Sequence, residues 1–320
     1  MTTASAEVTS NRPLACSRLS LEAEEDLAGT ASTVSGYLVI EHGGPWGTKV
    51  LRDAPFADPD GTGVPLGAYL TSALAPLGVT TLLARRPGAR HGIPGQVTVM
   101  LVSFDGSTAH GARTTVGAVS RLFGWQWPAL LDELRSGVLP QGWQPLGTQL
   151  LVCAHARRDA CCGELGRPLV AALAALDPER TWEVSHVGGH RFAPNTLVLP
   201  DGLVYGRLGA SRARDLLDAH ADGRMLTDAL RGRAGLPGPV QAAELAVRDA
   251  ARADGDRDVS LLEVTDEGGL TSSRWSARGR NWRVAVETRP GEGLDRPSSC
   301  GKDPVTPSPR YVVLEVIPED

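Results

Sequence analysis

The spacing of apolar residues along the chain predicts a mixture of helices and strands. Residues 1–33 are a polar lead-in, with one short helical stretch near 19–27. In the next part, residues 34–142, short runs rich in Val, Leu and Thr predict strands, and segments with one apolar face predict helices. We expect strands at 36–41, 80–85 and 96–104, and helices at 65–77 and 128–136.

A compact unit is expected over residues 143–231, after a loop with Pro and Gly at 139–147. A hairpin turn is expected at Pro200-Asp201-Gly202, because these residue types favour tight turns. The apolar pattern predicts strands at 149–153, 182–185, 196–199 and 203–206, and helices at 160–176 and 213–221. That order, βα-β-ββ-α, is typical of a thioredoxin-like fold.

The last part begins after a Gly- and Pro-rich segment at 232–239, which predicts a linker. A helix is expected at 240–253, followed by strands at 259–264, 275–277, 282–287 and 311–317. This C-terminal α+β part, residues 240–320, is poor in helices and is a candidate to pack on the N-terminal part. The fold class is therefore α/β, a thioredoxin-like unit flanked by N- and C-terminal α+β parts.

Charge and composition exclude some partners. The formal net charge is -5 and aromatic residues make up only 5%, which argues against a nucleic-acid-binding protein. The sequence shows neither a signal-peptide pattern nor an apolar run long enough to span a bilayer, so we expect a cytoplasmic protein with no membrane partner. Cysteines in a reducing compartment are more often metal ligands or redox groups than disulfide partners.

Four residues are candidates for a metal centre. Cys153 ends a predicted strand and Cys162 follows it, with eight residues between them, at the start of a predicted helix. His186 follows the next predicted strand, and His190 comes four residues later. In a thioredoxin-like unit the loops after these two strands lie side by side, so thiolates and imidazoles would meet there and could bind a metal.

The spacing of the ligands leaves the metal open. Eight intervening residues are too many for a zinc knuckle, although His-x3-His would suit zinc. A 2Fe–2S cluster tolerates separated cysteines, and two cysteines with two histidines is Rieske-type ligation. Gly188-Gly189, between the histidines, would let the backbone wrap closely around a bulky group. The residues favour a cluster over zinc or no metal.

The motifs Cys153-x8-Cys162 and His186-x-Gly-Gly-His190 resemble those of the sucrase/ferredoxin-like family, in its thioredoxin-like 2Fe–2S ferredoxin branch. The resemblance covers nearly the whole chain: Cys16 with AGTA (28–31), GGPWG (43–47), RFAPN (191–195), LPDGLVYGRL (199–208) and SCGK (299–302). It implies that Cys153, Cys162, His186 and His190 hold one 2Fe–2S cluster. Cys161, a second thiol beside Cys162, departs from the pattern, but the spacing favours Cys162.

The resemblance implies a soluble electron-transfer protein with an unknown redox partner protein, a reductase or an acceptor. Histidine ligation predicts proton-coupled redox, because reduction raises the pKa of the imidazole nitrogen that is not bound to metal; the reduction potential would fall as pH rises. Sucrase activity is not expected, because glycoside hydrolysis needs a placed pair of carboxylates and no motif supplies one. An electron carrier is favoured over a stand-alone enzyme. The alternatives are a zinc-stabilised binding module and a thiol oxidoreductase that uses Cys161 and Cys162.

Several other residues near these motifs have more than one interpretation. His155 is an alternative ligand or makes a local hydrogen bond. The flanking arginines could favour the reduced cluster, dock an acidic redox partner, or form a solvated surface; they are Arg157, Arg158 and Arg191. Cys161 is interpreted as a bystander thiol. Cys16 and Cys300, near opposite chain ends, are interpreted as lone thiols, although they could meet in the fold.

Overall fold

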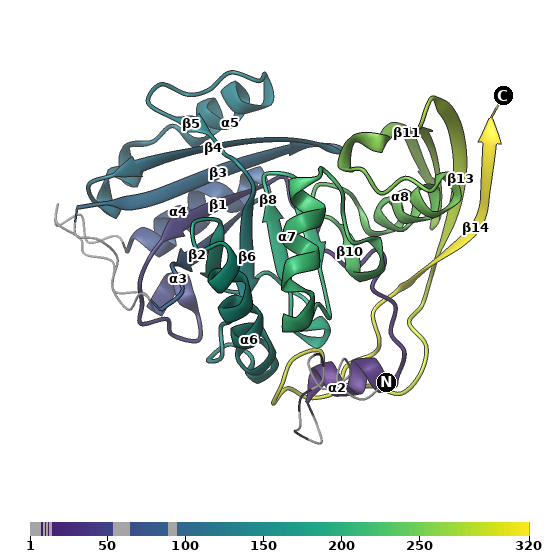
Figure 1. Ribbon diagram of the computed structural model, residues 1–320, viewed down its shortest axis with the longest axis horizontal. Helices are drawn as coiled ribbons and strands as arrows, with labels where there is room; N and C mark the ends of the chain where they lie inside the picture. Colours follow the sequence, from purple (N-terminus) through teal and green to yellow (C-terminus); the bar gives the residue numbers. More distant parts are fainter. Residues whose placement is uncertain are drawn as a thin grey trace.

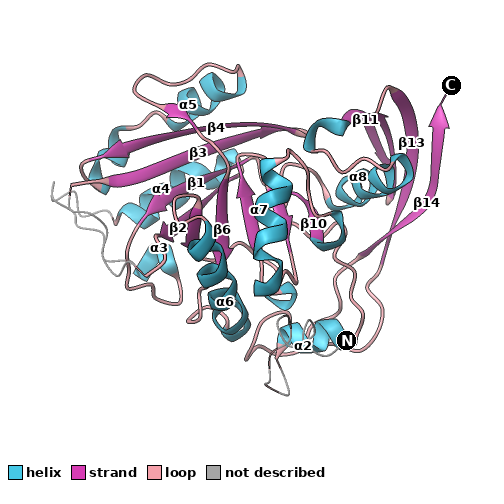
Figure 2. Cartoon of the chain, viewed as in Figure 1, coloured by secondary structure: helices cyan, strands magenta, loops and turns pink. Residues whose placement is uncertain are grey.

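A ten-stranded mixed sheet runs through most of the molecule (Figures 1 and 2). The computed structural model describes residues 8, 10, 12, 15–53, 65–88 and 95–319. The strand order is β10-β9-β8-β6-β7-β2-β1-β3-β4-β5. Strands of both the 34–142 and the 143–231 segments belong to this sheet, and they join where β2 pairs antiparallel with β7. A mixed α/β fold is thereby confirmed.

The first half of the sheet contains β1 (Gly36–Glu41), β2 (Val79–Arg85), β3 (Val97–Asp105), β4 (Thr108–Val116) and β5 (Gln144–Pro145). Its helices are α3 (Val50–Asp53), α4 (Leu66–Leu74), which continues as a 3-10 turn at Ala75–Leu77, and α5 (Trp127–Arg135). The expected strands and helices here are confirmed to within one residue at most of their ends. β4 was not predicted, because only Ala112 in it is fully buried and its sequence is largely polar.

The second half contains β6 (Gln149–Cys153), β7 (Thr181–Val184), β8 (Thr196–Leu199), β9 (Leu203–Tyr205) and β10 (Leu230–Arg233), with helices α6 (Ala160–Leu176) and α7 (Ala213–Ala221). β6 pairs parallel with β7 and antiparallel with β8, and β8 pairs antiparallel with β9. Every residue of β6 is buried, as its apolar sequence predicts. In Figure 1, α6 and α7 lie together over one face of these strands.

The C-terminal part is a helix on a second sheet. α8 (Gly238–Ala251) packs on β11 (Val259–Glu267), β12 (Leu270–Ala277), β13 (Arg280–Arg289) and β14 (Arg310–Glu319), which form an antiparallel sheet. The predicted linker at 232–239 is wrong at both ends, since β10 includes residues 230–233 and α8 starts at Gly238. A buried ion-pair group of Arg233, Glu244 and Arg248 connects β10 to α8.

The first described helix, α2 (Cys16–Glu22), starts earlier than the predicted stretch near 19–27. In Figure 1 it lies beside the yellow segment that precedes β14, below α6. The segment around Cys300, which precedes β14, and α2 are thus brought together next to the start of α6. Within the described ranges, the helices are all too short or too polar to cross a membrane.

Candidate metal centre

Cys153 and Cys162 are brought together by the turn from β6 into α6. Asp159 caps this helix, since its carboxylate accepts a hydrogen bond of 2.9 Å from the backbone N–H of Cys161. α6 then passes so close to the end of β6 that a Cβ on Gly166 would overlap the carbonyl oxygen of Cys153. A glycine is therefore needed for this approach, which places the first turn of α6 against Cys153.

The loop between β7 and the 3-10 turn at His190–Phe192 carries the two histidines. Gly188 and Gly189 both have left-handed backbones, with φ of 88° and 71°, which favours glycine at each position. The buried guanidinium of Arg231 donates to the carbonyl of Gly188 (3.2 Å) and to Oδ1 of Asn195 (2.9 Å), and it also donates to the carbonyl of Thr30. Arg231 therefore holds this loop against the lead-in segment.

The four residues predicted from the sequence lie together in the structure. Sγ of Cys162 is 3.3 Å from Nδ1 of His190, and the rings of His186 and His190 stack with centroids 4.0 Å apart and 17° between their planes. Cys153 and Cys162 are each 1% exposed and His190 is 6% exposed, whereas His186 is partly exposed. The imidazole of His186 is therefore partly open to solvent, whereas the other three side chains are not.

The two thiols differ in acidity. Hydrogen bonds from Cys162 and His186 lower the pKa of Cys153 well below its usual range, although burial acts in the opposite direction. The same contact with Cys153, followed by burial, raises the pKa of Cys162 well above its usual range. The pair thus favours one thiolate beside one thiol, and a thiolate is the form of cysteine that binds metal.

The imidazole of His190 is held neutral. Burial, followed by the electrostatic influence of the neighbouring His186 ring, lowers the pKa of His190 to about 4. A neutral imidazole has a lone pair for a metal, so the site presents soft sulfur and neutral nitrogen donors together.

The distances between these donor atoms limit which metal ion or cluster they could bind. Among the described residues, Asp159, Cys162 and His190 have ligand atoms that all lie within 4.8 Å of one another, and neither Cys153 nor His186 belongs to that group. One tetrahedral ion needs all four donors around a single point. A binuclear cluster divides its ligands between two irons and accepts a wider set. The residues present therefore fit a cluster better than one zinc ion.

A cavity of about 370 Å³ lies beside the exposed imidazole. Its lining includes His186 and His155 together with the basic side chains of Lys49, Arg52 and Arg158. His155 lines this cavity, and its Nε2 is 2.9 Å from the carbonyl oxygen of Gly47, 108 positions away in the chain. This hydrogen bond is therefore not the local one that was expected.

The arginines near the ligands have different roles. Arg191 forms an internal ion pair of 2.7 Å with Glu25 and is mostly buried, so it is not part of a free surface. Arg157 and Arg158 are exposed.

Arg231 was not predicted to belong to the site. It lies far along the chain from the histidines, inside the predicted compact unit, and an arginine at this position gives no sign in the sequence that it contacts the histidine loop.

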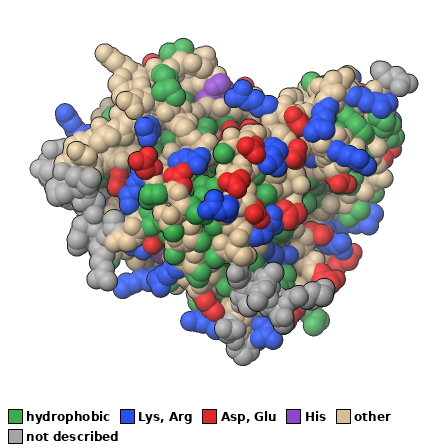
Figure 3. Space-filling model, viewed as in Figure 1, with side chains coloured by type: hydrophobic (Ala, Val, Ile, Leu, Met, Phe, Trp, Pro, Cys, Tyr) green, Lys and Arg blue, Asp and Glu red, His purple; other side chains and the backbone are tan. Residues whose placement is uncertain are grey.

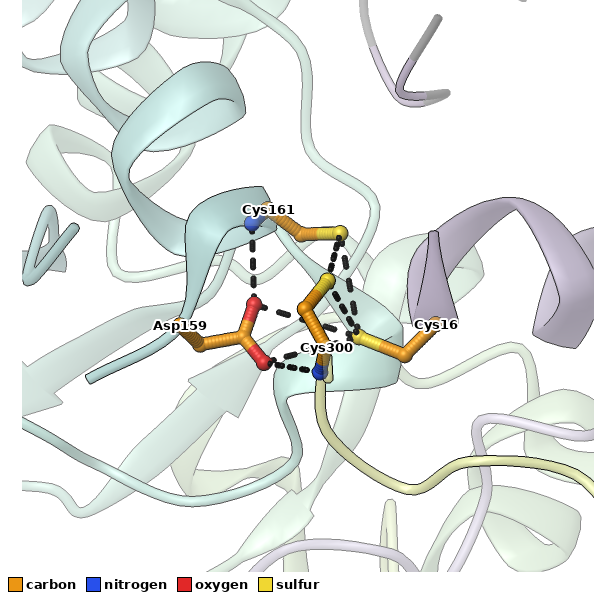
Figure 4. A group of neighbouring side chains, drawn as sticks. All are labelled: Cys16, Asp159, Cys161 and Cys300. Carbon is orange, nitrogen blue, oxygen red and sulfur yellow. Dashed lines mark hydrogen bonds between the residues drawn. The ribbon is translucent and has the colours of Figure 1, made fainter. Parts of the chain in front are cut away.

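Three further thiols form a group of their own. Sγ of Cys16 lies 3.7 Å from Sγ of Cys161 and 3.6 Å from Sγ of Cys300, and the last two are 3.1 Å apart (Figure 4). Cys16 and Cys300, interpreted as lone thiols, therefore meet in the fold, which was the alternative for this pair. They are 284 positions apart in the chain, so no local pattern in the sequence shows the contact. Cys161 faces this group, while Cys162 faces His190.

A family model for sucrase/ferredoxin-like proteins matches residues 27–232, more than half of the chain. The chain belongs to the sucrase/ferredoxin-like family. Among curated proteins it is similar to altered inheritance of mitochondria protein 32 of several yeasts. It is 28% identical over 116 residues to that of Saccharomyces kudriavzevii (32% of this chain, 35% of that protein). It is 32% identical over 96 residues to that of Saccharomyces cerevisiae strain YJM789 (26% and 31%).

A third relative, altered inheritance of mitochondria protein 32 of Kluyveromyces lactis, is 50% identical over 48 residues, 15% of each chain. The chain thus matches about a third or less of the length of these relatives. No solved structure matches.

Proposed function

We propose that this sucrase/ferredoxin-like protein transfers electrons and holds one 2Fe–2S cluster on Cys153, Cys162, His186 and His190. The observation that carries the proposal is the geometry of two buried thiols and two stacked imidazoles, spread too widely for one tetrahedral ion. A bound cluster would supply one-electron transfer at this position.

The topology around the site supports a thioredoxin-like unit. The strand order β7-β6-β8-β9, with β6 and β7 parallel and the remaining pairs antiparallel, together with α6 and α7 on one face, follows the expected βα-β-ββ-α order. In this arrangement the loops after β6 and β7 emerge at one edge, where the four proposed ligands lie. The ferredoxin-like family name agrees with this interpretation.

The chain's own residues would exclude water and exchange a proton. Cys153, Cys162 and His190 are almost fully buried, so they shield the site, whereas the partly exposed ring of His186 can exchange a proton with solvent. By linkage, electron uptake at the site and proton uptake on an imidazole would be coupled, and the reduction potential would fall as pH rises. His186 is therefore the imidazole through which this coupling is proposed to act.

The surface beside His186 suits an acidic redox partner. The cavity there is bordered by the basic side chains of Lys49, Arg52 and Arg158. On the face in Figure 3, by contrast, acidic and basic side chains are interspersed, so the molecule offers no broad single-sign field there. A local basic border next to the exposed ligand would orient an acidic donor or acceptor.

Metal and sulfide analysis of protein purified without oxygen tests the proposal. We expect red-brown protein with iron and acid-labile sulfide in equal amounts, and changed visible spectra in His186→Cys and His190→Cys. Zinc bound to the same four residues in a colourless protein would instead support the zinc-stabilised binding module. If both variants kept the wild-type spectrum, the ligand assignment would be wrong. The thiol oxidoreductase is less favoured, because the thiol of Cys161 contacts Cys16 and Cys300.

A further inference from the structure

A second group of potential ligands lies next to the proposed cluster site. Cys16 comes from α2, Asp159 and Cys161 from the start of α6, and Cys300 from the segment before β14 (Figure 4). Their ligand atoms all lie within 4.8 Å of one another. Cys16 and Cys161 are fully buried and Asp159 is 2% exposed, while Cys300 is partly exposed.

The distances in this group match those around one tetrahedral ion. At a Zn–S distance of about 2.3 Å, two sulfurs of a tetrahedral site lie about 3.8 Å apart. The sulfur of Cys16 is 3.7 Å from that of Cys161 and 3.6 Å from that of Cys300, and 3.7 Å from Oδ2 of Asp159. The remaining sulfur pair is closer, at 3.1 Å. Here, unlike at the first site, the ligand atoms of all four residues lie within 4.8 Å of one another.

The carboxylate of Asp159 supplies an independent indication of a cation. Asp159 is buried, yet no arginine, lysine or histidine within the described ranges forms an ion pair with it. It accepts hydrogen bonds from the backbone N–H groups of Cys161 (2.9 Å) and Cys300 (2.8 Å) and from the hydroxyl of Ser299 (2.9 Å). Sγ of Cys16 also lies within hydrogen-bond distance of both carboxylate oxygens, 3.9 Å from Oδ1 and 3.7 Å from Oδ2. A carboxylate has about four lone-pair positions, so a metal that replaces the thiol proton of Cys16 would take the remaining one. Buried charges are usually paired or coordinate metals.

We propose that Cys16, Cys161, Cys300 and Asp159 bind one zinc ion that fastens α2 and the segment before β14 to the start of α6. Soft thiolates with a carboxylate in a tetrahedral set favour zinc. Binding would release the thiol protons to solvent as the Zn–S bonds form. The ion would fix α2 and the segment around Cys300 beside Cys162, the neighbour of Cys161 in the proposed cluster site. Ser17, whose hydroxyl is 3.2 Å from the sulfur of Cys161, would orient that ligand.

The test is zinc and iron analysis of the full chain purified without oxygen, with X-ray absorption at the zinc edge. We expect about one zinc ion per chain, bound by three sulfurs and one oxygen. Cys16→Ser and Cys300→Ser should lose zinc and keep iron and the visible spectrum. Cys153→Ser should lose iron and keep zinc. Ser299→Ala, which removes a hydrogen bond to Asp159 but no ligand, is the matched control and should keep zinc.

Hydrogen exchange gives a second readout that does not depend on the variants. Removing zinc from the wild-type chain with a chelator should accelerate amide exchange in α2 and in residues 296–302 and leave β6 unchanged. Iron-loaded protein without zinc would overturn the proposal. Zinc that is retained in both Cys16→Ser and Cys300→Ser, or a Cys161–Cys300 disulfide in protein purified without oxygen, would also overturn it.

Discussion

Gly189 offers a sharp test of how Arg231 positions the histidine loop. A Cβ on residue 189 would lie 2.6 Å from Cζ and 2.7 Å from Nη1 of Arg231. The guanidinium cannot simply move away, because it is buried and donates to Gly188, Asn195 and Thr30. Gly189→Ala should therefore displace a buried charged group from the carbonyl groups and side chains that accept its hydrogen bonds.

The magnitude follows from two contributions. A left-handed backbone at a residue other than glycine costs about 1–2 kcal/mol, and φ at Gly189 is 71°. Losing one hydrogen bond of a charged donor costs about 1.5–3 kcal/mol more. We expect Gly189→Ala to lower the free energy of unfolding by about 3–5 kcal/mol in total.

Gly188→Ala is the matched control. Gly188 also has a left-handed backbone, with φ of 88°, but the atom that its Cβ would meet is Oγ of Ser32, at 2.7 Å. Ser32 is exposed, so its hydroxyl can rotate away. This variant should lose only about 1–2 kcal/mol.

Urea unfolding of the three proteins, with matched iron content, measures the difference between the variants. Equal destabilisation by Gly188→Ala and Gly189→Ala would refute the role assigned to Arg231, as would a loss below about 1 kcal/mol for Gly189→Ala.

Three further predictions concern pH, charge and redox. Burial lowers the pKa of His220 to about 4. Neutral His220 stabilises the folded state fully above about pH 6.5, the pKa of histidine in the unfolded chain, and this stability is lost as pH falls toward 4. Between these pH values the free energy of unfolding of wild type should therefore fall by about 2–3 kcal/mol more than that of His220→Gln. Glu244→Gln leaves buried Arg248 without its carboxylate and Arg233 with that of Asp256 alone, and should lower the free energy of unfolding by about 3–5 kcal/mol. Glu263→Gln, at a pair whose carboxylate side chain is 62% exposed, should change it by less than about 1 kcal/mol; similar losses would contradict this. In voltammetry, His186→Cys should show a smaller fall of reduction potential with pH than wild type, and an unchanged slope would exclude His186 as the proton-exchanging imidazole.

The spacing of apolar residues predicted those helices and strands that bury one face or their whole length. The bounds of β1, β6, α6 and α7 agree with the apolar runs in the sequence, because each of these elements buries a face or a whole strand. The second half of β10, Gly232 and Arg233, was placed in a linker because these residues are glycine and charged, yet all four residues of β10 are buried. Arg231 and Arg233 are buried there through partners on other segments, and periodicity does not report such partners.

The residues of the candidate sites were likewise predicted only where they lie close together in the sequence. Cys153, Cys162, His186 and His190 were found because each pair is close in sequence and the order of strands brings the two pairs together. The group of Cys16, Cys161 and Cys300 depends on contacts between residues more than 130 positions apart. Such contacts follow from the packing of α2 and of the segment around Cys300 beside the start of α6, which no local pattern encodes.

The central claim, that two histidines and two cysteines hold a 2Fe–2S cluster, is tested most directly by pulsed EPR on the reduced protein. Chains labelled with ¹⁵N-histidine should show two strongly coupled ¹⁵N nuclei, and His186→Cys and His190→Cys should each remove one of them. A reduced cluster signal without histidine nitrogen coupling, or the absence of any such signal from iron-loaded protein, would contradict the account.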